Sequence, residues 1–96
     1  MIIKFLKKII KIKLKIMNNL EKYKTVFCES FSISESVLEG DLEYNSIEAW
    51  DSVGHMGMIA DLEDKFDIML DTDDIIDFSS YKTGIKILKK YDIEVE

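Results

Sequence analysis

The chain has 96 residues, a length that fits one small domain and leaves no room for a second. Hydrophobic residues make up 47% and charged residues 33%, which is ordinary for a folded chain and too hydrophobic for wholesale disorder. The single cysteine, Cys28, excludes an internal disulfide. Because nothing points to an oxidising compartment, we expect a cytoplasmic protein.

The net charge of −6 is unevenly distributed along the chain. Residues 1–24 contain eight lysines and one glutamate, whereas residues 25–96 contain five lysines and eighteen acids. The chain has no arginine for bidentate phosphate binding, and its acidic body repels nucleic acid phosphates. We therefore expect no nucleic acid ligand and favour protein partners with basic patches.

Residues 1–17 form a basic extension that differs from the domain expected over residues 18–96. The first apolar residues of the extension have helical spacing, but from Ile10 to Ile16 they alternate with lysines as in a strand. Lysines interrupt it too often for a membrane span or a signal peptide, so we expect no stable membrane insertion. A peripheral helix on anionic lipid remains open. We favour a disordered or loosely packed tail, or sequence ahead of a start at Met17.

A first helix is predicted over residues 20–31. Asn18 and Glu21 have the spacing of a capping box, and an apolar stripe follows at Leu20, Tyr23, Val26, Phe27 and Phe31. The connection over residues 32–51 has no period. Its scattered apolar residues predict a packed loop, in which Leu42, Ile47 and Trp50 contact the bundle and a helical turn forms near Glu35 to Glu39.

A second helix is predicted from Ser52 to about Phe66, because Asp51 and Ser52 can both cap a first helical turn. Its expected apolar face contains Val53, Met56, Met58, Ile59, Leu62 and Phe66. The other face is acidic. A short helix over residues 71–78 should follow, with acids at its start and Ile75, Ile76 and Phe78 as anchors.

A last helix should be capped by Ser79 and Ser80 and should turn Tyr81, Ile85, Leu88 and Tyr91 inward. Residues 92–96 are expected to fray. The sequence thus predicts an all-α fold, a four-helix bundle of three main helices and one short helix with a long first loop.

Ser52 is the residue with the clearest chemical setting. It stands at the start of a predicted helix, where aligned peptide dipoles give a partly positive end. A phosphate or phosphodiester on the serine oxygen suits this position.

The segment Trp50-Asp51-Ser52-Val53, preceded by Ile47 and followed by Leu62-Glu63-Asp64-Lys65-Phe66, resembles the acyl carrier protein family. The resemblance covers residues 20–91. It implies an acyl-carrier-like bundle in which Ser52, within an Asp-Ser motif shared with Asp51, is esterified by 4′-phosphopantetheine from coenzyme A. The arm's thiol would hold an acyl or aminoacyl group as a thioester. The family's acidic docking surface would correspond to Glu48, Asp51, Asp61, Glu63 and Asp64.

This resemblance implies a monomeric, non-catalytic carrier. Its partners would be a phosphopantetheinyl transferase, an acyl- or aminoacyl-loading ligase or synthase, and a downstream acyltransferase with a basic patch. Val53 and Met56, next to Ser52, are expected on the partner-binding surface. The Gly-Gly-x-Ser signature of peptidyl carriers is absent, and the Trp50 form of the motif resembles stand-alone carriers of specialised biosynthesis. Fatty acid biosynthesis and other cargoes stay open.

Three features of the sequence suggest functions other than a carrier. Asp51, Ser52 and His55 suggest a hydrolase, but no Gly-x-Ser-x-Gly turn is present, and we expect His55 at the solvent edge. The acids of residues 67–77 lack the glycine and final glutamate of a calcium-binding EF-hand, so no metal site is predicted. The remaining alternative is an acidic helical adaptor that binds a basic protein without a prosthetic group.

Overall fold

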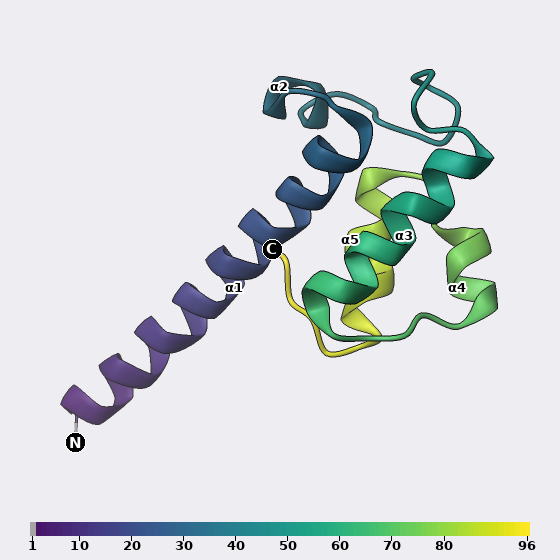
Figure 1. Ribbon diagram of the computed structural model, residues 1–96. Coiled ribbons are helices and arrows are strands. Elements are labelled where there is room, and N and C mark those ends of the chain that lie inside the picture. Colours follow the sequence, from purple (N-terminus) through teal and green to yellow (C-terminus); the bar gives the residue numbers. More distant parts are fainter. Residues whose placement is uncertain (1) are drawn as a thin grey trace.

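The computed structural model describes residues 2–96, in which five helices form (Figure 1). They are α1 (Ile2–Phe31), α2 (Glu35–Leu38), α3 (Ser52–Phe66), α4 (Thr72–Asp77) and α5 (Tyr81–Lys89). Within the described range there is no strand, and the only β-type pairing is an isolated antiparallel bridge between Glu43 and Ser80. The predicted all-α class is confirmed. Met1, the first residue of the expected extension, lies outside the described residues.

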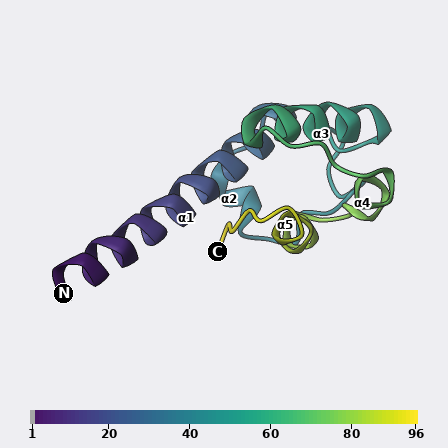
Figure 2. The same ribbon diagram turned by 90° about the horizontal axis from the view of Figure 1, so that it is seen from below.

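Helix α1 is longer than the sequence predicted. It runs without a break from Ile2 to Phe31, so Asn18 and Glu21 lie inside the helix and the predicted capping box is wrong. The expected boundary between residues 17 and 18 also falls within the helix. Neither glycine nor proline interrupts these 30 residues, and lysine, leucine and methionine are good helix formers. The described part of the basic extension is therefore helical, and it projects away from the bundle in two views (Figures 1 and 2).

The core lies between the second half of α1 and helices α3 and α5. The predicted stripe on α1 is confirmed, because Tyr23, Val26, Phe27 and Phe31 are buried. The ring of Phe27 lies 5.5 Å from that of Trp50 and 5.0 Å from that of Tyr81, measured between centroids. Edge-to-face aromatic pairs at such distances add to the apolar burial. Further core residues are Met58, Ile59 and Leu62 of α3 and Ile85, Ile87 and Leu88 of α5.

The loop over residues 32–51 is packed, as predicted. Leu42 and Trp50 are buried, Ile47 is half-buried, and α2 is the expected helical turn. The end of this loop lies directly against the first turn of α3. A Cβ atom on Gly54 would stand 1.9 Å from the Ala49 carbonyl oxygen, so this approach requires glycine.

The chain end differs from its expected frayed state. Ile93 and Val95 are buried, and the Asn19 side-chain amide donates a 3.0 Å hydrogen bond to the Glu94 carbonyl. The prediction for residues 92–96 is wrong because these apolar side chains join the core and α1 offers a polar partner to the backbone. The last-helix cap is confirmed for Ser80, whose hydroxyl accepts a 2.9 Å bond from the Thr83 N–H.

Candidate functional site

The start of α3 is built as the sequence predicted. Asp51 is the N-cap, and its Oδ1 accepts a 2.7 Å hydrogen bond from the Gly54 N–H. Ser52 is the first residue of the helix and is exposed. Because the Asp51 carboxylate accepts the capping hydrogen bond, the Ser52 hydroxyl is not used as the cap. The site therefore presents a serine oxygen at a helix end whose dipole favours an attached negative charge.

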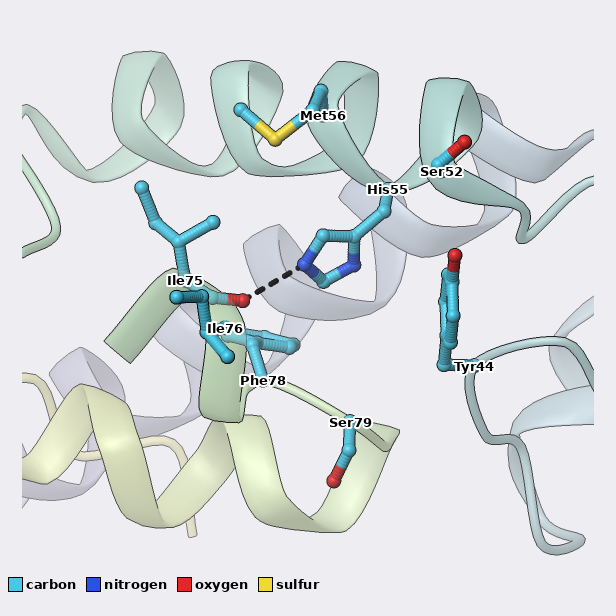
Figure 3. Close-up of a pocket in the computed structure, with 8 residues that line it drawn as sticks. All are labelled: Tyr44, Ser52, His55, Met56, Ile75, Ile76, Phe78 and Ser79. Carbon is cyan, nitrogen blue, oxygen red and sulfur yellow. Dashed lines mark hydrogen bonds between the residues drawn. The ribbon is translucent and has the colours of Figure 1, made fainter. Parts of the chain in front are cut away.

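A pocket of about 270 Å³ opens beside Ser52. It lies between α3 and α4 (Figure 3), and its lining residues are mostly apolar: Tyr44, Ser52, His55, Met56, Ile75, Ile76, Phe78 and Ser79. The volume is slightly below the range of roughly 300–1,000 Å³ that is usual for drug-sized ligands. A small apolar group attached near Ser52 would fit its chemistry.

His55 forms a bridge behind this pocket. The Trp50 Nε1–H donates to His55 Nδ1 at 2.9 Å, and His55 Nε2 lies 2.9 Å from the Ile75 carbonyl oxygen (Figure 3 shows the second bond). An indole N–H can only donate, so Nδ1 accepts and the neutral ring carries its proton on Nε2. The bridge thus joins the end of the loop, the first turn of α3 and α4.

The expected solvent-edge position of His55 is incomplete, because the residue lines the open pocket but is also bonded into the fold. The residue is half-buried, and both ring nitrogens have partners other than Ser52. A nucleophilic serine needs a histidine nitrogen directed at its oxygen. This arrangement supplies none, and it weighs against the hydrolase alternative.

Two apolar residues of α3 lie on the surface beside Ser52. Val53 is 79% exposed and Met56 is 53% exposed, so their predicted place in the apolar face is wrong. Their predicted place on a partner-binding surface is compatible with this exposure. Ile76 of α4, expected to anchor its helix, is also exposed, whereas Ile75 is half-buried and Phe78 is buried.

The acids expected on the docking surface fall into two groups. Glu48 and Asp64 are exposed and make no side-chain hydrogen bond in the described structure. The other three accept hydrogen bonds within the fold: Asp51 caps α3, Asp61, although exposed, accepts a 2.7 Å bond from the Ser30 hydroxyl, and Glu63 accepts a 2.8 Å bond from the Leu70 N–H. Asp61 and Glu63 therefore stabilise the fold, whatever they contribute to binding.

The acidic stretch of residues 67–77 also has an internal role. Asp74 is buried and accepts hydrogen bonds from the Tyr91 hydroxyl at 2.6 Å and from the Lys90 ammonium at 2.9 Å. The Tyr91 bond, followed by that of Lys90, lowers the pKa of the Asp74 carboxyl. Across residues 2–96 no group of three or more His, Cys, Asp and Glu side chains is arranged to hold a metal ion.

Sequence reasoning missed the contributions of Tyr44, Ser79 and the Trp50–His55 pair to this site. Tyr44 comes from a loop without any period, and Ser79 was interpreted only as a cap. The Trp50–His55 spacing of five residues carries no local signal, because its meaning depends on Ile75 in another helix. A search with models of known protein families finds no match to this chain, and a search of curated protein sequences finds none either.

Proposed function

We propose that this protein is a carrier whose Ser52 bears 4′-phosphopantetheine and presents a thioester-bound acyl or aminoacyl group to partner enzymes. The observation that carries the proposal is an exposed serine at the first position of a capped helix, beside an open apolar pocket. The resemblance of the surrounding sequence to acyl carrier proteins agrees with this geometry. The chain itself contributes presentation, and its partners contribute the chemistry.

The attachment step has a simple balance. The Ser52 oxygen attacks the phosphorus that bears the pantetheine of coenzyme A, a new P–O bond forms, and adenosine 3′,5′-bisphosphate leaves. A base on the transferase takes the serine proton. The resulting phosphodiester has one negative charge, which the α3 dipole stabilises by about 0.3–1 kcal/mol at an exposed site.

The pocket indicates what sort of cargo fits. Met56, Ile75 and Ile76 surround it with flexible apolar side chains, and the His55 bridge closes its inner end. A short apolar acyl group matches this volume better than a long chain.

Intact mass spectrometry tests the proposal directly. After incubation with a phosphopantetheinyl transferase and coenzyme A, the wild type should gain one arm and Ser52→Ala should gain none. Ser79→Ala is the matched control, because Ser79 also lines the pocket, and it should be modified normally. No modification of the wild type, or equal modification of Ser52→Ala, would contradict the carrier proposal. The acidic adaptor, supported by charge alone, would then be the better explanation.

The docking surface can be tested on the acids that have no structural bond. Glu48→Lys combined with Asp64→Lys should slow modification several-fold, because rim charges act mainly on association rates. Glu21→Lys, an exposed charge reversal on α1, should leave the rate unchanged. Asp61 and Glu63 are unsuitable for this test because their replacement also removes internal hydrogen bonds. Equal rates for all variants would show that Glu48 and Asp64 only keep the protein soluble.

A further inference from the structure

The part of α1 that precedes the core has two distinct faces. We name residues 2–17 the basic segment. Since an α-helix turns about 100° per residue, five of its six lysines gather in an arc of about 100°. These are Lys4, Lys7, Lys8, Lys11 and Lys15. The apolar residues occupy the other side, an arc of about 200°, and only Lys13 lies among them.

The apolar side of the basic segment is largely uncovered. Its exposed members range from 51% exposure at Leu6 to 74% at Ile2, and they also include Ile3, Phe5, Ile10, Ile12, Leu14 and Met17. Only near its end does the segment meet the rest of the chain, where Ile12, Lys15 and Ile16 border a hollow with Asp92 and Glu94. A contiguous apolar surface of this kind marks an interaction site.

The shape and charge of the basic segment select its partner. An apolar arc of about 200° is wider than the stripe of about 100° that a helix normally buries against a protein core. A second copy would offer no acids to pair with these lysines, because the segment contains none. A bilayer with anionic lipids accepts a wide apolar face at the depth of the headgroups, and lysines at the edges extend to the phosphates. The six lysines and the absence of acids in the segment provide the complementary charge.

We propose that the basic segment binds the surface of an anionic membrane, lying in the plane of the interface, and holds the carrier domain there. It does not cross the bilayer, since none of the helices in the described chain is both long and apolar enough to do so. Residues 25–96 carry five lysines against eighteen acids, so anionic lipid repels the body. The acidic surface around Ser52 thereby stays accessible to partners in solution. This inference does not depend on the modification of Ser52.

Cosedimentation of the full chain with vesicles tests the proposal. The wild type should bind vesicles made of equal parts phosphatidylcholine and phosphatidylglycerol, and it should bind pure phosphatidylcholine far more weakly. Each lysine near an anionic surface strengthens binding roughly fivefold, so the triple variant Lys4→Gln, Lys7→Gln, Lys11→Gln should lower the partition coefficient roughly 100-fold. The control Lys65→Gln, Lys86→Gln, Lys89→Gln removes three exposed lysines of α3 and α5 and should change it less than about threefold.

A second variant separates insertion from simple charge attraction. Phe5→Gln, Leu6→Gln and Ile10→Gln together keep every charge but remove apolar contact, and they should weaken binding at least about tenfold. These residues lie outside the core, so the thermal midpoint should stay unchanged and confirm an intact body. Ser52→Ala should bind as the wild type does, which keeps this test separate from that of the carrier function.

The proposal is overturned if the wild type does not bind anionic vesicles or binds neutral and anionic vesicles equally. It is overturned as well if the Lys65, Lys86, Lys89 control loses as much binding as the Lys4, Lys7, Lys11 variant. It is also overturned if the apolar triple variant binds as well as the wild type. Sedimentation equilibrium covers the remaining alternative: a dimer that dissociates on loss of Phe5, Leu6 and Ile10, without vesicle binding, would identify the segment as a self-association surface.

Discussion

The hydrogen-bonded bridge through His55 gives the sharpest prediction about stability. In His55→Ala, the Trp50 indole N–H loses its acceptor, and the Trp50 side chain is completely buried in the wild type, at 0% exposure. Leaving a buried donor unpaired costs about 1–3 kcal/mol, and loss of the bond to the Ile75 carbonyl adds about 1 kcal/mol. We therefore expect His55→Ala to lower the free energy of unfolding by about 2–4 kcal/mol, a large fraction of the stability of so small a domain.

A double-mutant cycle isolates the bridge from the accompanying loss of packing. Trp50→Phe removes the donor but keeps an aromatic ring next to Phe27 and Phe31. In that background His55→Ala no longer orphans an indole N–H, so its cost should fall by about 1 kcal/mol or more. Urea titrations followed by far-ultraviolet circular dichroism measure all four proteins, because this signal reports the helices and does not depend on the single tryptophan.

The coupling energy between Trp50 and His55 decides whether their hydrogen bond stabilises the fold. A coupling energy below about 0.5 kcal/mol would refute the predicted stabilisation, because independent sites deviate from additivity by no more than that. Ser52 modification adds a second measurement. Neither ring nitrogen of His55 is directed at Ser52, so His55→Ala should still accept the arm at temperatures where it is folded. Complete loss of modification in a folded variant would give His55 a direct role that its contacts do not indicate.

Four further substitutions test the fold, each measured by chemical or thermal unfolding. Gly57→Ala should add up to about 1 kcal/mol, since its Cβ meets open space on a helix, whereas Gly54→Ala should cost about 1–3 kcal/mol because its Cβ would clash with the Ala49 carbonyl. Val95→Ala should cost about 2 kcal/mol, and an unchanged midpoint would mean that the chain end is frayed after all. Asp74→Asn should lower the thermal midpoint at neutral pH. The lowered pKa of Asp74 contributes stability in full above the unfolded value of about 3.9, so the difference from wild type should begin to shrink as the pH falls below about 4 and should vanish below the lowered pKa of the folded state.

Local chemistry explains which parts of the site could be predicted from the sequence. The start of α3 was predictable because Asp51 caps an N–H only three residues away. The same holds for Ser80 and the start of α5. The pocket was not predictable in this way. Its walls come from a loop, α3 and α4, and His55 acquires its role only when folding brings the Ile75 carbonyl within 2.9 Å.

The errors at the two chain ends have a common cause. Asn18 and Glu21 have the right spacing for a cap, but a cap forms only where the chain enters a helix from another conformation. Here the preceding residues are themselves helix formers, and extending an existing helix costs far less than nucleating one. Because α1 is continuous, the Asn19 side chain lies next to the chain end and donates a hydrogen bond to the Glu94 carbonyl. This bond helps to order residues 92–96, which look too short to be ordered from the sequence alone.

The continuity of α1 links the two proposals physically. The basic segment and the core residues Tyr23 to Phe31 belong to a single helix of 30 residues, about 45 Å long, with no glycine or proline at which it could bend sharply. A carrier on a flexible tether would sample all orientations at a membrane. On a continuous helix, the angle between the lipid-binding face and the α1 core stripe is fixed by the residues between them. The direction in which Ser52 faces the solution is then set by the packing of α1 against α3. Inserting a few helical residues between Met17 and Tyr23 should therefore rotate Ser52 relative to the bilayer. The same insertion should leave vesicle binding unchanged.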